Sequence, residues 1–219
     1  MSDEVFLSTV VRGERRVLCF PDWTQAFIAS MLFRRFRVPE KLGRVIDVGA
    51  SCGAFTVPLM AVVPEVSVVA IEPSSWAWPY FEMNTRGLAG IELIRMAASD
   101  KEETLTLSMP PGEDKRLGIE TVYGGGAFAQ EVPAKRLDDM VSGPVDLIKL
   151  DVEGHEEAVL EGARRIVAEY HPRLIVEVKS KRQGPAGRTP DDLVAFIVRL
   201  GYGFPVNLWG HDHLFEWGQ

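Results

Sequence analysis

The sequence has few cysteines and no excess of positive charge. Cys19 and Cys52 are its two cysteines, and they lack the short spacing of a metal site. We therefore expect a reduced, cytoplasmic protein. The 24 lysines and arginines are outnumbered by 31 aspartates and glutamates, which gives a formal net charge of −7. Because this sign opposes binding to nucleic-acid phosphates, we expect no nucleic-acid partner.

Long apolar runs are also missing. Asp47, Pro58 and Pro64 interrupt the most hydrophobic windows, so none approaches the roughly 18 apolar residues that cross a bilayer. The polar start, Ser2 to Glu4, is unlike a secretory signal, and we expect no membrane partner. The 219 residues, 46% of them hydrophobic, suit a single domain over 1–219, with its oligomeric state open and a homodimer one option.

Two parts are expected within this domain, an N-terminal ribbon and helix (1–40) and an α/β core (41–219). Val5–Val11 and Arg16–Phe20 flank a glycine turn and predict a β-hairpin, and Asp22 begins a predicted helix. Short apolar runs then alternate with amphipathic stretches, as in a parallel sheet covered on both faces. The predicted strands are Arg44–Val48, Val66–Ile71, Ile91–Met96, Val145–Leu150 and Leu174–Val178, and the predicted helices are Ala54–Val63, Trp76–Arg86, Glu153–Tyr170 and Asp191–Leu200.

The remaining segments of the core are less regular. Tyr202–Val206 and His213–Trp217 can add two strands around a turn at Asn207–Asp212, one of them antiparallel at the edge. Residues 110–130 and Ser180–Thr189 show no lasting periodicity and predict loops. We expect 110–130 to be either a substrate-covering lid or a floppy insertion. Both loops follow strands, so they are placed to form a substrate pocket.

A glycine turn after the first core strand is the sharpest local motif. Asp47 ends that strand, and Gly49 and Gly53 allow the tight turn and close ligand approach that precede the next helix. The Gly-x-x-x-Gly spacing matches neither a dinucleotide fingerprint nor a phosphate loop. Glu72 follows the second strand, where a carboxylate can accept hydrogen bonds from both ribose hydroxyls. Together these features favour a nucleoside ligand.

A second motif follows the fourth core strand. Asp151, Glu153 and His155 alternate before a helix, and Gly154 permits a sharp turn. His155 is a candidate general base, although Glu153 can instead cap the helix while His155 packs locally. Glu177 ends the fifth strand and can face the same crevice or pair with Lys179. Asp151, Glu153 and Glu177 can also hold a divalent cation, but a metal-free carboxylate cluster explains them equally, so no metal is assigned.

These motifs resemble the FkbM family of S-adenosylmethionine-dependent methyltransferases over about Arg44 to Lys179. The matching segments are Asp47-Val48-Gly49-Ala50-Ser51-Cys52-Gly53, Ile71-Glu72-Pro73, Ala97-Ala98-Ser99-Asp100, Ile148-Lys149-Leu150-Asp151-Val152-Glu153-Gly154-His155-Glu156 and Val159-Leu160-Glu161-Gly162-Ala163. The resemblance implies a Rossmann-like seven-stranded sheet flanked by helices. It departs at Ser51-Cys52, where relatives commonly carry an asparagine.

The resemblance also implies a role for each matched position. Gly49, Ala50, Ser51 and Gly53 would surround the methionine part of S-adenosylmethionine, and Asp47 would organise their turn. Glu72 would bind the ribose, Ala98 and Ser99 the adenine, and Asp151 the methionine amino group or the transferred methyl. Apart from the resemblance, the residue types and positions make His155, Asp151, Glu153 and Glu177 the candidates for the catalytic cluster.

The predicted function is methyl transfer from S-adenosylmethionine, giving S-adenosylhomocysteine, to a hydroxyl of a small molecule such as a sugar, a polyketide or another secondary metabolite. The choice of oxygen comes from the resemblance. N-methylation, carboxylate methylation or another S-adenosylmethionine-using transfer would suit the same scaffold. A nicotinamide-dependent oxidoreductase and a non-catalytic Rossmann-like module are further alternatives, against which the glycine spacing and the intact acid/base cluster argue respectively.

Overall fold

The computed structural model describes residues 5–11, 14–20, 42–63, 65–108, 129–179 and 189–218. The predicted N-terminal helix after Asp22 lies outside the described residues. So do most of the predicted loop 110–130 and residues 180–188 of the polar insertion. The division into parts 1–40 and 41–219 of one domain therefore stays a prediction.

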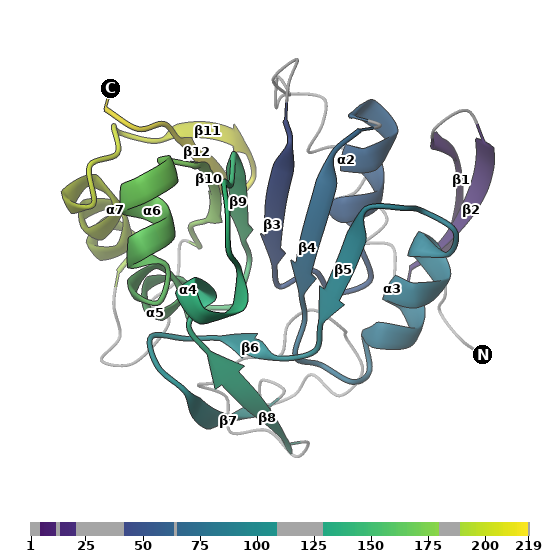
Figure 1. Cartoon of the computed structure of the whole chain (residues 1–219), viewed down its shortest axis with the longest axis horizontal. Coiled ribbons are helices and arrows are strands. Elements are labelled where there is room, and N and C mark those ends of the chain that lie inside the picture. Colours follow the sequence, from purple (N-terminus) through teal and green to yellow (C-terminus); the bar gives the residue numbers. More distant parts are fainter. Residues whose placement is uncertain are drawn as a thin grey trace.

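Seven of the described strands form one mostly parallel sheet (Figure 1). They are β3 (Arg44–Val48), β4 (Ser67–Ile71), β5 (Ile91–Ile94), β9 (Leu147–Leu150), β10 (Arg173–Glu177), β11 (Val206–Trp209) and β12 (Asp212–Phe215). Their order is β11-β12-β10-β9-β3-β4-β5, with β12 antiparallel to both neighbours. The order reverses between β3 and β9, and open α/β sheets bind ligands at the carboxyl side of such a point.

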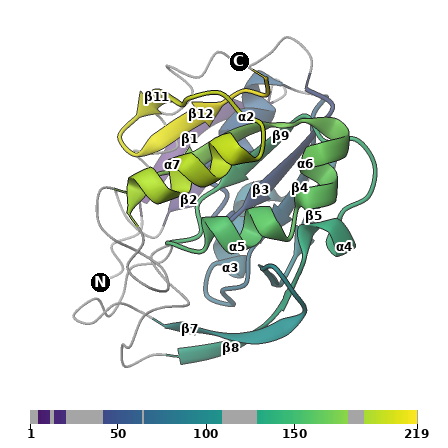
Figure 2. The same ribbon diagram turned by 90° about the vertical axis from the view of Figure 1, so that its left-hand side faces the viewer.

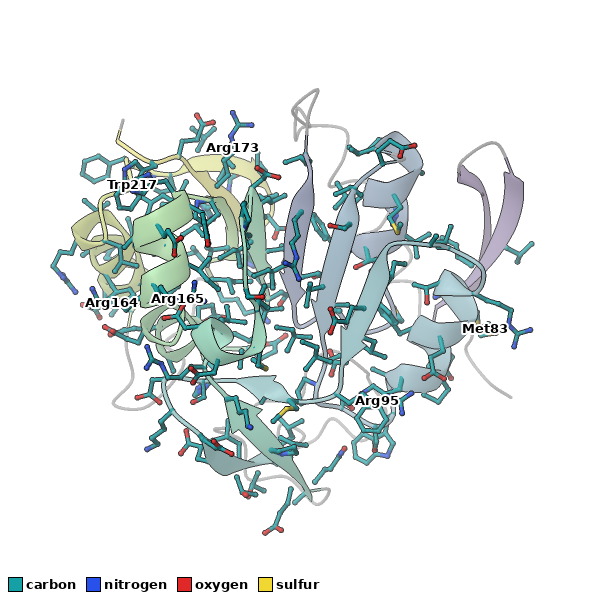
Figure 3. The ribbon with its side chains drawn as sticks, in the orientation of Figure 1. Met83, Arg95, Arg164, Arg165, Arg173 and Trp217 are labelled. Carbon is teal, nitrogen blue, oxygen red and sulfur yellow. The ribbon has the colours of Figure 1, made fainter. Side chains whose placement is uncertain are left out.

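Helices cover both faces of this sheet. α5 (Glu156–Glu161), α6 (Arg164–Tyr170) and α7 (Pro190–Arg199) lie on the face shown in Figure 2, and α2 (Thr56–Val62) and α3 (Trp78–Thr85) lie on the other. Successive side chains of β3 point to opposite faces of the sheet, so Ile46 packs with α5–α7 and Val45 packs with α2. Side chains fill both interfaces (Figure 3). No helix in the described part of the chain has the length and apolar character needed to span a membrane.

Most core elements agree with the predicted ones, with three corrections. The predicted strand Tyr202–Val206 is wrong, because β11 begins only at Val206 and Tyr202 forms an isolated bridge with Trp217. The predicted helix Glu153–Tyr170 is two helices, α5 and α6, separated near Gly162. A Cβ at Gly162 would lie 2.0 Å from the Ser99 carbonyl oxygen, so the helix junction is pressed against that strand end. The predicted turn Asn207–Asp212 is also wrong, because its residues belong to β11 and β12 except at Gly210-His211. Gly210 has φ +55° and permits this tighter turn.

A second, three-stranded sheet lies beyond the carboxyl ends of β4 and β5 (Figure 1). It consists of β6 (Ala97–Ala98), β7 (Glu103–Ser108) and β8 (Ala129–Lys135) in the order β6-β8-β7. The sequence analysis missed it, since β6 has two residues and β7 and β8 stand on opposite sides of the long loop. The predicted loop 110–130 is too long at its end, because residues 129–130 already belong to β8.

The predicted N-terminal hairpin is confirmed as β1 (Val5–Val11) paired antiparallel with β2 (Glu14–Phe20). The buried side chain of Asn84 in α3 fastens it to the core. Its amide nitrogen donates to the Cys19 and Cys52 carbonyls, both at 2.8 Å, and its oxygen accepts from the Cys19 N–H at 2.7 Å. One side chain therefore joins the hairpin to the glycine turn.

Candidate active site at the carboxyl edge of the sheet

A cavity opens at the carboxyl ends of β3, β4 and β9, where the sheet order reverses. Residues from β6 and β7 close it on the side of the second sheet. Its lining comprises Asp47, Val48, Gly49, Ala50, Ser51, Ala54, Phe55, Ile71, Glu72, Pro73, Ser74, Ala97, Ala98, Leu107, Lys149, Asp151, Val152, Glu153 and His155. Both sequence motifs, although far apart in the chain, therefore meet at one cavity.

Most of the predicted site residues line this cavity, with three exceptions. Gly53, Ser99 and Glu177 are absent from the lining. Gly53 lies in the glycine turn and has φ +86°. Glu177 lies next to Asp151 and Glu153. Ser99 is fully buried, and its hydroxyl contacts His155. The cofactor and catalytic roles of all the predicted site residues, these three included, stay predictions.

The glycine turn is fixed by contact with the strand ends around it. Gly49 has φ +79°, and a Cβ there would lie 1.9 Å from the Asp151 carbonyl oxygen. The Gly49 and Ala50 N–H groups donate to the Ile71 carbonyl at 2.9 and 3.2 Å. Because β9 and β4 both meet the turn at these atoms, only glycine fits at position 49.

Ser51 occupies a strained position in the same turn. Its φ is +47°, a region that residues with a Cβ rarely adopt and that concentrates at functional sites. Its N–H donates to the Glu72 carboxylate at 2.8 Å. The Ser51 hydroxyl oxygen is buried and has no hydrogen-bond partner among the described residues. Since buried polar atoms are normally paired, this hydroxyl faces the cavity as an open binding group.

Glu72 is held in place by contacts to its side chain and its backbone. Its carboxylate accepts from Ser51 N–H at 2.8 Å and from Ser74 N–H at 2.7 Å. Its carbonyl accepts from the indole N–H of Trp78 at 2.8 Å, and the guanidinium of Arg95 lies 4.8 Å over that ring (Figure 3). A carboxylate offers about four acceptor positions, and the two backbone bonds hold this one at the wall of the cavity.

A buried charge network underlies the cavity. The Lys149 ammonium lies 3.4 Å from Asp151 and 3.5 Å from Asp212. Burial alone would lower the pKa of Lys149, but the carboxylates of Asp151, Asp212 and Glu177 together raise it. Nearby, Asp47 accepts from the Thr56 hydroxyl at 2.6 Å, and burial raises the pKa of Asp47 to about 6. Lys149 therefore supplies the positive charge that this acidic pocket floor requires.

The sequence analysis gave no role to Lys149. The signal that could have found it is a lysine within the apolar strand Leu147–Leu150, which has parallel neighbours on both sides. A charge at such a position needs buried counter-charges, and these come from the end of the same strand and from β12. The partner on β12 could not be identified without the sheet order.

The predicted carboxylate cluster assembles as expected but contains its own cation. Oxygens of Asp151, Glu153 and Glu177 all lie within 4.8 Å of one another. The Lys179 ammonium forms ion pairs with Glu153 and, at 3.0 Å, with Glu177. The cluster therefore already contains a positive charge from the protein itself, next to two of its three carboxyl groups. No metal is assigned to them.

Glu177 gives the fold a dependence on pH. Burial and the adjacent Asp151 carboxylate raise the pKa of Glu177 to about 9. A group with a raised folded pKa stabilises the fold fully below its unfolded pKa, and this contribution is lost as the pH rises toward the folded value. We therefore expect the free energy of unfolding to fall between about pH 5 and 9, by at most about 1.4 kcal/mol per pH unit from this group.

Urea unfolding from pH 5 to 9 checks this, with Glu177→Gln as the test variant and Glu65→Gln, at an exposed position, as the control. Glu177→Gln keeps the shape without the ionisation, so its stability should change less with pH. Glu65→Gln should follow the parent protein. Identical pH profiles for Glu177→Gln and the parent would contradict the assignment.

His155 is buried at the cavity wall, at the start of α5. Burial lowers the pKa of His155, and the carboxylates of Glu103 and Asp100 only partly oppose this effect. The ring is therefore neutral at pH 7 and able to accept a proton. Its Nε2 lies 3.2 Å from the Ser99 hydroxyl.

The loop that carries the acidic motif is itself strained. Glu153 has φ +54° and Gly154 has φ +100°, two successive residues in left-handed conformations. The buried carboxylate of Glu156 accepts from the Gly154 N–H at 3.1 Å and the Val152 N–H at 3.4 Å. Glu156, whose role the sequence analysis missed, thus holds the loop that presents Glu153 and His155.

Comparisons with known proteins agree with this geometry. The family model of the methyltransferase FkbM domain matches residues 47–204. Methyltransferase sdnD of Sordaria araneosa is 26% identical, with 67% of this chain and 68% of that protein covered. The crystal structure of methyltransferase FkbM from Methylobacillus flagellatus KT matches with a TM-score of 0.59 at 18% identity, covering 87% of this chain. The chain spans about half of that protein, 48% of its length.

A further solved structure shows the same fold. Aeropyrum pernix fibrillarin, crystallised with natively bound S-adenosyl-L-methionine, matches with a TM-score of 0.54 at 13% identity, covering 96% of this chain and 81% of that one. The family match includes the glycine turn, Glu72 and the loop after β9. The chain therefore belongs to the FkbM family of methyltransferases, and it has the Rossmann-like fold of solved methyltransferases, one of which binds S-adenosyl-L-methionine.

Proposed function

We propose that this enzyme transfers the methyl group of S-adenosylmethionine to a hydroxyl oxygen of a small molecule. The observation that carries the proposal is that a neutral buried imidazole, His155, shares one cavity with the anchored carboxylate of Glu72. The Glu72 carboxylate can bind the ribose of a nucleoside, and the His155 imidazole can accept the proton of a hydroxyl group. The overall charge of −7 favours a small acceptor over a nucleic acid.

The polar groups of the cavity suit the cofactor. The Glu72 carboxylate, held at the cavity by the Ser51 and Ser74 N–H groups, can accept from the ribose hydroxyls. The Ser51 hydroxyl, which has no hydrogen-bond partner among the described residues, can pair with the methionine part. Asp151 can receive the positively charged amino group, because Lys149 lowers the pKa of Asp151 against the opposing effect of burial. Ala98 leaves an apolar wall on which adenine can rest. The Ser51-Cys52 departure from the family pattern is compatible with these roles, since Ser51 retains a free hydroxyl oxygen.

S-Adenosylmethionine supplies a methyl group on a positively charged sulfur, which leaves as a neutral thioether. The protein must then align the acceptor and remove its proton as the oxygen–carbon bond forms. His155 takes the proton of the acceptor hydroxyl and becomes an imidazolium. The carboxylates of Glu103 and Asp100, which raise the pKa of His155, stabilise that charged form.

The proposed reaction can be tested by incubating the protein with methyl-labelled S-adenosylmethionine and three series of small acceptors that offer hydroxyl, amine or carboxylate groups. We expect label in alkali-stable O-methyl products and release of S-adenosylhomocysteine. Transfer to amines alone, or to carboxylates as alkali-labile esters, would overturn the choice of oxygen. Adding a metal chelator should leave the rate unchanged, since the Lys179 ammonium already pairs with Glu153 and Glu177.

The ribose role of Glu72 predicts a specific loss. Glu72→Ala removes charge-assisted hydrogen bonds, so the affinity for S-adenosylmethionine should fall by about 1.5 to 3 kcal/mol, roughly 10- to 150-fold. Calorimetric titration measures this, with Glu92→Ala, at an exposed position of β5, as the control that should bind normally. Glu72→Gln separates loss of charge from loss of the Ser51 and Ser74 contacts. Unchanged affinity in a folded Glu72→Ala protein would contradict the assignment.

A further inference from the structure

The second sheet brings a carboxylate to the proposed base through a buried serine. The Ser99 hydroxyl oxygen lies 3.2 Å from His155 Nε2, 2.9 Å from a Glu103 carboxylate oxygen and 3.3 Å from an Asp100 carboxylate oxygen. Ser99 has no exposed surface and follows β6, whereas Glu103 begins β7. Residues on three different elements thus converge on one hydroxyl group.

The hydrogen-bonding capacity of the Ser99 hydroxyl determines which group donates in its contact with His155 Nε2. A serine hydroxyl has one proton to donate, whereas an ionised carboxylate only accepts. Of the two carboxylates Glu103 is the nearer, and a carboxylate oxygen is a stronger acceptor than a neutral imidazole nitrogen, so the Ser99 proton goes to Glu103. The hydroxyl oxygen then faces His155 Nε2 with a lone pair. Nε2 must therefore carry the ring proton, and in the neutral ring Nδ1 carries the lone pair.

We propose that Ser99 and Glu103 are positioning residues that fix His155 in the tautomer with its proton on Nε2, so that the lone pair of the neutral ring is on Nδ1. The catalytic consequence rests on the proposed function, but the tautomer itself does not. Glu103 is fixed in turn, because its other carboxylate oxygen pairs with Lys101 at 3.3 Å. The second sheet therefore orients the base in addition to lining the cavity.

The tautomer can be read directly from two-bond ¹⁵N–¹H correlations of the labelled protein at a pH where the ring is neutral. The chain has four histidines, so a His155→Gln variant assigns the signals. We expect the Nε2–H form in the parent protein and a mixture of tautomers in Ser99→Ala. Glu103→Gln keeps an oxygen acceptor and should retain the Nε2–H form, whereas Glu103→Leu should lose it.

Ser108→Ala is the matched control. Ser108 is a buried serine on the same sheet, and its hydroxyl has no partner among the described residues. This variant should leave the His155 signals unchanged. In the methyl-transfer assay, Ser99→Ala should lower kcat roughly 10- to 100-fold with little change in the affinity for S-adenosylmethionine.

The outcomes separate this inference from the proposed function. An Nδ1–H tautomer in the parent protein, or an unchanged tautomer in Ser99→Ala, would overturn the positioning role. The predicted tautomers together with undiminished transfer in His155→Gln would confirm the positioning of the ring and reject His155 as the base.

Discussion

Replacing Gly49 with alanine should destabilise the protein by about 2 to 5 kcal/mol and abolish binding of S-adenosylmethionine. Two costs add in this substitution. A left-handed residue with a Cβ costs roughly 1 to 2 kcal/mol, and overpacking costs roughly 1 to 3 kcal/mol. Here the new methyl group would lie 1.9 Å from the Asp151 carbonyl oxygen, a main-chain atom that no side-chain rotation can move away. Separation of β3 from β9 at this point would open the cavity.

Gly210→Ala is the control that isolates the first cost. Gly210 also has a positive φ, +55°, but no atom of the described residues lies within 4 Å of the point that a Cβ would occupy there. Urea unfolding should therefore show a loss of only about 1 to 2 kcal/mol for Gly210→Ala, with normal cofactor binding. Equal losses in the two variants would show that the contact with Asp151 is unimportant.

The second large effect is expected for Lys149→Met. Methionine matches the length and apolar character of the lysine stem, but it leaves the partly buried carboxylate of Asp151 and the buried carboxylate of Asp212 without their shared cation. Breaking a buried ion pair by removing one partner costs about 3 to 5 kcal/mol. Lys149 also lowers the pKa of Asp47, so its removal raises that pKa further. The loss should therefore be larger at pH 8 than at pH 5, where the carboxyl groups are more readily protonated.

Chemical unfolding at the two pH values measures this effect. Lys135→Met is the control, because Lys135 is partly exposed and pairs with Glu102 at 3.4 Å on the surface. Such a pair contributes at most about 1 kcal/mol, so the control should be nearly as stable as the parent protein. A Lys149→Met protein as stable as this control would contradict the network.

The core of the fold could be predicted because each element carries its own pattern. The segment Arg44–Val48, for example, is followed by a glycine turn, and this pattern predicts a strand that leads into a helix. Glu72, Asp151 and His155 follow strands of the same parallel sheet, so their convergence on one edge follows from topology. The sequence analysis therefore agrees best with the structure for residues that directly follow strands of the parallel sheet.

The contacts that were missed depend on tertiary partners. The role of Lys149 depends on Asp212 in a strand that enters between β10 and β11. The place of Ser99 depends on Glu103, in a sheet whose strands are too short or too widely separated to recognise. Lys179 pairs with both Glu153 and Glu177, but its sequence neighbourhood indicates only the second. Local hydrophobic periodicity cannot predict pairings between residues that are far apart in the sequence.

The antiparallel strand β12 has a consequence for the order of folding during synthesis. The ribosome releases Lys149 well before Asp212, and domains assemble from the N-terminal side as the chain emerges. Until β12 leaves the exit tunnel, β10 presents an unpaired edge and the ammonium lacks one of its counter-charges. A nascent chain stalled before residue 212 should therefore hold an incomplete sheet that depends on chaperones, and release of β12 should complete the fold.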